Sequence, residues 1–335
     1  TAGEMQHDPA KNVLHAVEPL TAIAVRLGID PETAGRRLRL AEDRLRAARA
    51  ARPAPLVDHS RYTGWNGMVA GALVRAGTIL DDDWAMGHAL RTLHRIHSEH
   101  ENPAALRHNP GGIGGLLDDQ VQVALAAIEA HEATGDPAWL RWSVTLMERA
   151  WADYLDARSG GLFDTAGVEG EGLLPTRVKP VQDAPTPSPN GVAALCAARL
   201  AELTGEPRWR ERRDGLVRSF AGRAEQLGIF GATLLQAIDW SVNPASHLVI
   251  VEGDNAPLAG AMHRAALGAF LPRRVVQRVR AADLANATLP VAVTGMIDAT
   301  AGTRGYACVG VTCQVPAATL EDWQETLQRL TLAPH

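Results

Sequence analysis

The chain has 335 residues, of which 46% are hydrophobic and 21% charged, and its formal net charge is -5 at pH 7. This composition is typical of a globular protein with a sizeable core, and the charge supplies no basic field for a nucleic acid. The apolar runs are much shorter than the roughly 20 residues that cross a bilayer, and the first residues lack the features of a signal peptide. The chain has three cysteines, an odd number that fits a reducing compartment better than a set of disulfides. Together these features predict a cytoplasmic protein without nucleic-acid or membrane partners.

Residues 1–55 are expected to form connecting or lid helices. One helix is predicted around Val17 to Leu27, and a charged helix follows from Pro31 to Ala51. The segment Arg52-Pro53-Ala54-Pro55 ends the second helix, because proline removes a helical hydrogen bond.

A short motif repeats along residues 56–242. The segment Thr134-Gly135-Asp136-Pro137 recurs as Thr204-Gly205-Glu206-Pro207, and looser copies occur near Gly77 and Gly28. In each copy glycine is expected to end one helix and an acidic residue to begin the next. A proline follows the acidic residue in every copy except the one near Gly77. Each copy therefore predicts a helical hairpin.

The helices before these turns differ in their distribution of apolar residues from the helix that follows Thr134-Gly135-Asp136-Pro137. Residues 68–80, 116–131 and 192–203 are apolar on most faces, whereas residues 139–155 carry one apolar stripe. Alternating inner and outer helices predict a mostly α fold, a partial or complete (α/α)6 toroid of helical hairpins over residues 56–242. Fewer hairpins are recognisable than a full ring needs, so a homo-oligomer or a partner chain that completes the toroid remains open.

The pattern changes in two other parts of the chain. Residues 160–189 are rich in glycine and proline and are predicted to form a long loop with a short hairpin. Residues 243–335 are predicted to form a small C-terminal α/β appendix. Its expected elements are strands at 246–251, 274–279 and 306–313 and helices at 257–270 and 320–330.

The glycine-rich loop at residues 111–115 precedes the predicted catalytic residues, Asp118 and Asp119. Adjacent carboxylates at the mouth of a buried helix can differ in pKa and share one proton, which suits acid/base catalysis. The alternative is a capping role, because aspartate is favoured in the first turn of a helix.

A second group of residues is predicted to bind substrate, because its members lie at the starts of inner helices or in the loops before them. A tryptophan beside an asparagine offers a stacking face and an amide to a sugar ring, and loop cations bind carboxylates, phosphates or polarised hydroxyls. The alternatives are a buried Trp with a capping Asn, an ordinary loop histidine, and surface cations that serve solubility. The residues are Trp65, Asn66, His108, Arg177, Lys179, Asp183 and Asn190.

No metal or cofactor site is predicted. His94, His97 and His100 are three apart, so on a helix the third turns away from the first. Cys308 and Cys313 are expected to frame one strand with their side chains on opposite faces, which predicts neither a disulfide nor a zinc site. The sequence contains no phosphate-loop, dinucleotide-binding or zinc-protease motif.

Several motifs occur in an order that resembles the C-terminal part of the DUF255 family, that of spermatogenesis-associated protein 20 and YyaL-like proteins. The resemblance covers nearly the whole chain and implies a six-hairpin toroid akin to N-acylglucosamine 2-epimerases and related glycoside hydrolases. It also implies that the chain lacks the family's N-terminal thioredoxin-like domain and first hairpins. The motifs are Lys11–His15, Tyr62–Gly67, Leu116–Asp119, Gly160–Thr165, Arg177–Asn190 and Tyr306–Pro316.

The chain departs from that family at three motifs. The family's Leu-Asp-Asp-Tyr ends here in Gln120, its Asp-Gly-Ala is replaced by Asp183-Ala184-Pro185, and its Ser-Gly-Asn-Ser is replaced by Ser188-Pro189-Asn190-Gly191. The first hypothesis is a carbohydrate-active enzyme of isomerase, epimerase or glycoside hydrolase type, acting on a sugar or another small polar metabolite with carboxylate acid/base residues. The alternatives are a non-catalytic binding or scaffold subunit that completes a toroid with a partner chain, and a biosynthetic enzyme on a non-sugar substrate.

Overall fold

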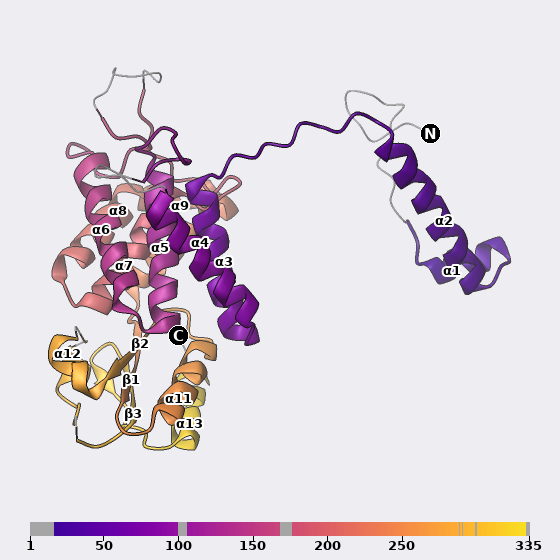
Figure 1. The fold of residues 1–335 in the computed structure, drawn as a ribbon. Coiled ribbons are helices and arrows are strands. Elements are labelled where there is room, and N and C mark those ends of the chain that lie inside the picture. The colour runs from indigo at the N-terminus through magenta and orange to yellow at the C-terminus, as the bar shows by residue number, and fades with distance from the viewer. Residues whose placement is uncertain are drawn as a thin grey trace. The chain divides into compact units, whose positions relative to one another are not determined.

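The computed structural model describes residues 17–99, 106–167, 176–287, 289, 291–298 and 300–332 (Figure 1). The motif at residues 11–15, His100 and the middle of the predicted 160–189 loop lie outside the described residues. The chain divides into two compact units, with the boundary between His59 and Ser60. Within the described part of the chain, no helix is long and apolar enough to cross a membrane.

The first unit contains a helical hairpin. It consists of α1 (Leu20–Leu27) and α2 (Pro31–Ala50). Gly28 ends α1 in the left-handed conformation, and the Asp30 carboxylate accepts a hydrogen bond from the Thr33 N–H to cap α2. The turn therefore folds as its sequence predicts.

The second unit begins with an arc of helical hairpins. Their inner helices are α3 (Thr63–Leu80), α5 (Leu117–Thr134) and α7 (Pro189–Thr204), and their outer helices are α4 (Asp83–Glu99), α6 (Pro137–Tyr154) and α8 (Pro207–Phe220). Short turns of helix follow, namely η1 (Ala221–Arg223), α9 (Ala224–Leu227) and η2 (Gly228–Gly231), and then a further inner helix, α10 (Ala232–Val242). Each inner helix packs against the next along the arc.

The two closest copies of the repeated motif form the predicted turns between inner and outer helices. In the copy near Gly77 the prediction that glycine ends the helix is wrong, because α3 continues to Leu80 and Asp81 ends it with a φ of 54°. Gly135 and Gly205 end α5 and α7 with φ values of 73° and 68°, which glycine adopts easily. A proline occupies the first turn of both α6 and α8, and Asp136 caps α6. These local signals explain why the hairpins were predictable from sequence.

The inner helices differ in how completely they are enclosed. Most residues of α5 and α7 are buried, as predicted. The inner helix α3 is also apolar on most faces, but it is less enclosed, because α5 is the one inner helix that packs closely against it within the described part of the chain. Trp65 and Val69 on α3 are 58% and 57% exposed. Within the second unit, α3 is therefore the edge helix of the arc.

A small α/β part follows α10. The strand order is β2-β1-β3-β4, with β1 parallel to β2 and antiparallel to β3. Helices α11 and α13 bury one face of the sheet through Met262 and Trp323, and Tyr306 lies in the core on the other face. The elements are β1 (Ser246–Glu252), α11 (Ala256–Gly268), β2 (Arg274–Arg280), η3 (Ala281–Asn286), α12 (Val291–Thr294), β3 (Arg304–Val309), β4 (Thr312–Cys313) and α13 (Leu320–Leu332).

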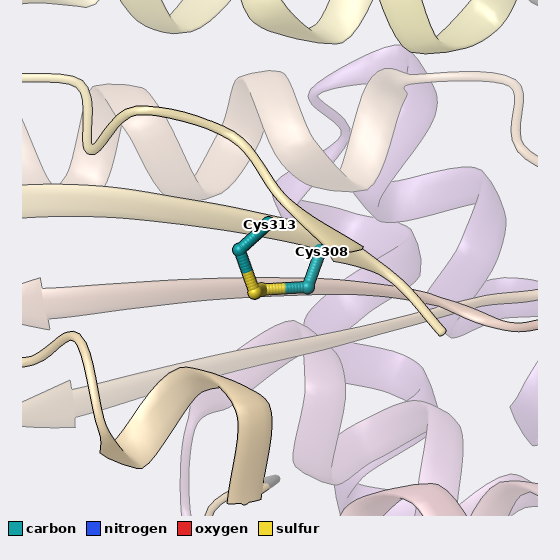
Figure 2. Close-up of a disulfide and its surroundings, with 2 residues drawn as sticks. All are labelled: Cys308 and Cys313. Atoms are coloured by element: carbon teal, nitrogen blue, oxygen red, sulfur yellow. A yellow bond between two sulfur atoms is a disulfide. The ribbon is translucent and has the colours of Figure 1, made fainter. Parts of the chain in front are cut away.

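The prediction for the two C-terminal cysteines is wrong, because Cys308 and Cys313 form a disulfide (Figure 2). They do not share one strand. The chain turns at Gly310, whose φ is 57°, so that β3 and β4 form a hairpin with the two cysteines directly opposite each other. Their Cα atoms are 3.9 Å apart.

The predicted fold class is confirmed. The chain is mostly α-helical, with a partial toroid of helical hairpins followed by a small α/β part. The N-terminal ends of the inner helices lie on the same side of the arc, because α3 and α5 pack in parallel with Gly64 beside Asp119 and Gly71 beside Ala126. The loops that precede these helices therefore gather at one end.

Candidate functional site

A cavity of about 460 Å³ lies on the inner side of the helical arc. The helices α3, α5, α7 and α10 all contribute to its wall, for example through Gly67, Gln122, Val192 and Trp240. The segment before β2 also lines it, through Leu271. The cavity therefore lies between the inner helices.

Glycines on α3 let that helix approach α5 closely. A Cβ atom on Gly67 would lie 3.1 Å from the backbone nitrogen of Val123, and one on Gly64 would lie 2.7 Å from Asp118 Oδ2. Such distances are too short for an ordinary side-chain contact. The absence of a side chain at Gly64 leaves room for the carboxylates at the start of α5.

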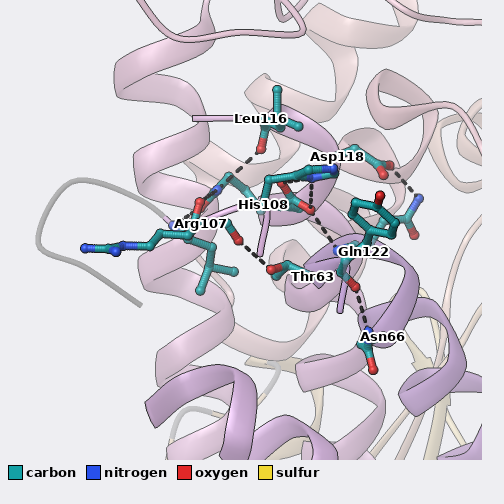
Figure 3. A network of polar contacts seen from close by, with 12 residues as sticks. Thr63, Asn66, Arg107, His108, Leu116, Asp118 and Gln122 are labelled. Atoms are coloured by element: carbon teal, nitrogen blue, oxygen red, sulfur yellow. Dashed lines mark hydrogen bonds and ion pairs between the residues drawn. The ribbon is translucent and has the colours of Figure 1, made fainter. Parts of the chain in front are cut away.

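Asp118 is not among the described residues that line the cavity, but it contacts one of them. It precedes the cavity-lining Gln122 by one turn of α5, so both side chains lie on the same helical face. Gln122 Nε2 donates to Asp118 Oδ1 at 3.1 Å (Figure 3). It also donates to the carbonyl oxygen of Pro187 at 3.3 Å. Burial raises the pKa of Asp118, although the Gln122 hydrogen bond and His108 act in the opposite direction. Asp118 is thus a half-buried carboxyl that contacts the cavity wall through Gln122.

Asp119 is completely buried beside the start of α3. Its Oδ1 accepts a hydrogen bond from the Gly64 N–H at 2.8 Å, and its Oδ2 lies 3.0 Å from His108 Nδ1 (Figure 3). Burial raises the pKa of Asp119 to about 6, against the opposing effects of His108 and Gly64. Asp119 therefore has a capping role, but it caps the first turn of the neighbouring helix α3 and not its own helix.

His108 is held in a fixed orientation. Its backbone N–H donates to Ile113 and its carbonyl oxygen accepts from the Thr63 N–H, while its ring lies 4.9 Å from that of Tyr62. Since Asp119 engages Nδ1, Nε2 is the ring nitrogen that remains for a ligand, and the side chain is 30% exposed. A carboxylate that orients an imidazole in this way prepares it for proton transfer.

The two aspartates lie close together but in different surroundings. The Cβ position of Gly64 is 2.7 Å from Asp118 Oδ2 and 3.2 Å from Asp119 Oδ1, so these oxygens are within about 6 Å of each other. His108 interacts electrostatically with both carboxyl groups. The structure therefore brings Asp118, Asp119 and His108 together as one polar group.

Trp65 and Asn66 are placed differently. Trp65 packs edge-on against Tyr62 with ring centroids 5.0 Å apart, on the exposed flank of α3. The side-chain amide of Asn66 donates to the carbonyl oxygen of Tyr62 at 2.7 Å. Neither residue is among the described residues that line the cavity.

Arg177 and Lys179 hold the loop after α6. Arg177 Nε donates to the carbonyl oxygen of Thr165 at 2.9 Å, and the guanidinium lies 4.1 Å from the centre of the Phe163 ring. Lys179 Nζ lies 2.6 Å from Asp156 Oδ2, and this contact holds the pKa of Asp156 well below its usual value. These cations bind the protein's own loop.

Asp183 and Asn190 connect helix starts and loops. Asp183 accepts from the N–H groups of Ser188 at 2.7 Å and Thr233 at 2.8 Å, which links the beginnings of α7 and α10. The buried Asn190 side chain accepts from the N–H of Leu162 and donates to its carbonyl oxygen, at 2.8 and 2.9 Å. Both residues stabilise the loops around the mouth.

The sequence analysis missed a set of charged residues at the other end of the cavity. Arg199 on α7 pairs with Glu129 and Glu132 on α5, and Arg75 and Arg274 also line this region. Burial raises the pKa of Glu129, but Arg199 more than offsets this effect, whereas the pKa of Glu132 is raised by burial. The available sequence signal was Arg199, a charged residue within the otherwise apolar helix α7. Because a buried charge requires a partner, such a residue indicates a buried ion pair.

The described residues contain no group of three or more His, Cys, Asp or Glu side chains placed to hold a metal ion. His94 and His97 instead contact aromatic rings, those of Trp139 and Trp142, at centroid distances of 4.7 and 4.9 Å. The third histidine of that series lies outside the described residues.

No protein-family profile matches the chain. Among curated proteins, it is 26% identical to spermatogenesis-associated protein 20 of Homo sapiens and 25% identical to that of Rattus norvegicus, each over 288 residues. These alignments cover 82% of this chain and 36% of each relative, so the chain spans little more than a third of their length. The similarity indicates distant homology over most of the chain.

Solved structures that match part of the chain include mannanases and an epimerase, each with a TM-score below 0.5. For a GH76 alpha-mannanase of Bacteroides thetaiotaomicron the TM-score is 0.46 at 14% identity, with 67% of this chain and 63% of that chain covered. For cellobiose 2-epimerase of Bacillus thermoamylovorans the TM-score is 0.41 at 10% identity, with 50% and 46% covered. An inactive alpha-1,6-mannanase of Salegentibacter sp., with two successive aspartates replaced and alpha-1,6-mannotriose bound, gives 0.42 at 14% identity, with 48% and 47% covered.

Proposed function

We propose that the chain is a carbohydrate-active enzyme of isomerase or epimerase type, acting on a sugar or sugar-derived metabolite in the inner-helix cavity. The observation that carries this proposal is the contact of Asp118 with the cavity-lining Gln122, next to the buried Asp119–His108 pair. We also propose that the chain corresponds to the C-terminal part of the DUF255 family.

The cavity wall supports a polar ligand with a ring. Gln122, Thr233 and Gln236 offer amide and hydroxyl groups, and Trp240 offers an aromatic face. Amides and hydroxyls both donate and accept hydrogen bonds, as sugar hydroxyls require, and aromatic faces stack on apolar ring surfaces.

The different surroundings of the two aspartates favour proton transfer over glycoside hydrolysis. Two-carboxylate hydrolysis requires both carboxyl groups to flank the scissile bond, whereas Asp119 is enclosed and engaged by Gly64 and His108. In our proposal, Asp118 and His108 are the catalytic residues and Asp119 is a positioning residue. One of them, as the base, removes the proton from a carbon beside the sugar carbonyl. The C–H electron pair forms the C=C bond of an enediolate as the carbonyl π electrons move to oxygen, and the other group, in its protonated form, returns a proton to carbon.

Solvent exchange tests this proposal directly. The chain would be incubated in D₂O with reducing mono- and disaccharides, and deuterium at the carbon beside the carbonyl would be measured by NMR. We expect exchange that falls at least 100-fold in Asp118→Asn and His108→Gln. The matched control is Glu211→Gln, which removes an exposed carboxylate on the outer helix α8 and keeps full exchange.

Two results would overturn the enzyme proposal. One is exchange that persists in Asp118→Asn, and the other is a panel on which the folded chain exchanges no sugar proton. Thermal melting of each variant shows whether a loss reflects chemistry or unfolding.

The exposed flank of α3 favours a second candidate, a non-catalytic subunit that completes a toroid with a partner helical hairpin. Trp65, Val69, Ala72 and Ile79 follow helical spacing and are all exposed, whereas the inner helices α5 and α7 are enclosed. A double variant, Trp65→Glu with Val69→Glu, should abolish any concentration-dependent association seen by sedimentation. Trp84→Glu on α4 is the control, because it removes an exposed tryptophan from an outer helix.

A further inference from the structure

We infer that the end of the cavity away from Asp118 binds an anionic group of the ligand, a carboxylate or a phosphate, through Arg75, Arg199 and Arg274. This inference rests on the proposed function, because it specifies the class of molecule that the same cavity takes. It adds an acidic sugar or sugar phosphate as the expected ligand.

The three arginines reach the cavity from different elements. Arg75 lies on α3, Arg199 on α7 and Arg274 at the start of β2, and all three line the cavity. The charged residues that share this lining are Glu129 and Glu132 of α5. Three guanidinium groups thus face two carboxylates, which leaves an excess positive charge among the described lining residues.

The buried guanidinium groups have donors left over. The Arg199 side chain forms ion pairs with Glu129 and with Glu132, and its Nη2 lies 2.9 Å from Glu132 Oε1. The Nε atom of Arg199 is buried without an acceptor in the described part of the chain. Arg274 donates from its terminal nitrogens to the carbonyl oxygens of Ala269 and Leu267, and its Nε is likewise buried without an acceptor. Buried donors are normally satisfied, so both guanidinium groups are incompletely paired. The two Nε atoms are enclosed, and an anion in the cavity would therefore offset the charge of these groups without bonding to Nε.

Arg75 supplies a different contribution. Its side chain is exposed and follows the α3 face that packs along α5, one turn after Gly71. It interacts electrostatically with Glu129. Because it is exposed, Arg75 can be changed without creating a buried unpaired charge, which makes it the residue to test.

The anionic end lies far from the proton-transfer end. Asp118 and Glu129 are eleven residues apart on α5, which corresponds to about 16 Å along the helix axis. A monosaccharide acid held by the arginines would not contact Asp118, and a ligand that reaches both ends must be elongated. Binding at the arginines can therefore be measured separately from catalysis.

Isothermal titration of the full chain would test the inference with D-galacturonate and D-glucose 6-phosphate, against neutral D-galactose and D-glucose. We expect the anionic probes to bind at least tenfold more tightly than their neutral counterparts. Arg75→Gln should weaken anion binding at least tenfold, whereas Arg91→Gln, which removes an exposed arginine from α4, should change it less than twofold. Inorganic phosphate as a further probe shows whether the anion binds without the sugar.

The inference is overturned if the neutral sugars bind as tightly as the anionic ones, if no anionic probe binds, or if the two arginine variants behave alike. Its failure is distinguishable from failure of the proposed function. Asp118-dependent deuterium exchange without anion preference contradicts only the inference. Arg75-dependent anion binding without any exchange supports the inference and contradicts the proposed enzyme activity.

Discussion

Asp118 and Asp119 are neighbours in sequence, yet they face different parts of the molecule. Successive residues of an α-helix point about 100° apart, so one carboxylate lies beside the cavity-lining Gln122 while the other faces the start of α3. Asp118 contacts Gln122, and Asp119 contacts Gly64 and His108. At the scale of residues, the site therefore separates a group that can meet a ligand from a group that positions others.

This separation predicts unequal effects on stability. Asp119→Ala leaves the Gly64 N–H without its buried acceptor, which costs about 1–3 kcal/mol of unfolding free energy. Asp118→Ala removes a half-buried hydrogen bond from Gln122 and should cost less than about 1 kcal/mol. Urea unfolding of both variants measures the difference, and equal losses would show that the two carboxylates have equivalent structural roles.

The raised pKa of Asp119 predicts a pH dependence of stability. Its folded pKa of about 6 exceeds the unfolded value of 3.8, so the ionised carboxylate costs stability above pH 6 and this cost disappears as the pH falls toward 4. The free energy of unfolding of the wild type, minus that of Asp119→Asn, should therefore rise on acidification, by up to about 3 kcal/mol.

The same comparison in a His108→Gln background provides the control. His108 lowers the pKa of Asp119, so without it the rise should begin at a higher pH. A difference that stays flat between pH 7 and 4 would mean that Asp119 does not titrate in this range.

The sequence identified Asp183 and Asn190 as residues of interest, but it could not predict which residues they contact. Asp183 bonds to Thr233, 50 residues away, and Asn190 bonds to Leu162, 28 residues away. A sequence pattern gives no information on such pairings, because they depend on how the loops pack. The candidate aspartates were identifiable from a local signal, the first turn of a buried helix, whereas their partner His108 gained its role only through the fold.

At the scale of elements, the close packing of α3 on α5 depends on specific glycines. A Cβ atom on Gly67 would lie within 3.2 Å of backbone atoms of Gln122 and Val123, whereas one on Gly71 would lie 3.5 Å from Ala126, an ordinary contact. The two positions are one helical turn apart and both are buried. They form a matched pair for substitution.

We predict opposite effects for these two glycines. Gly71→Ala should raise the free energy of unfolding by about 0.5–1 kcal/mol, because alanine favours the helix. Gly67→Ala should lower it by about 1–3 kcal/mol, because the helices must move apart. Chemical denaturation measures both, and a stabilising Gly67→Ala would contradict the proposed contact.

Element prediction succeeded where the signal was local. The Gly-Asp-Pro and Gly-Glu-Pro turns specified where α5 and α7 end and where α6 and α8 begin. It failed at residues 306–313, where an apolar run was interpreted as one strand although Gly310 turns the chain into a hairpin. The disulfide between Cys308 and Cys313 follows from that turn.

At the scale of the whole molecule, the two compact units are joined by an exposed segment. Residues 51–60 are all exposed, and residues 53–60 belong to neither a helix nor a strand. The residues that line the cavity all belong to the second unit. The composition and the repeats predicted helical hairpins in both units, but they could not indicate that the arc has its edge at α3, which depends on tertiary packing.

This organisation predicts the first product of limited proteolysis. Exposed segments without regular structure are the preferred sites of cleavage, so a nonspecific protease at low concentration should first cut within residues 53–60. Mass spectrometry should find a stable fragment that extends from about residue 60 towards the C-terminus, and circular dichroism should show that it unfolds cooperatively. Because this fragment contains the whole cavity lining, it should bind D-galacturonate with the same affinity as the intact chain. Early cleavage within the helical arc, or a fragment that does not unfold cooperatively, would contradict the division at His59 and Ser60.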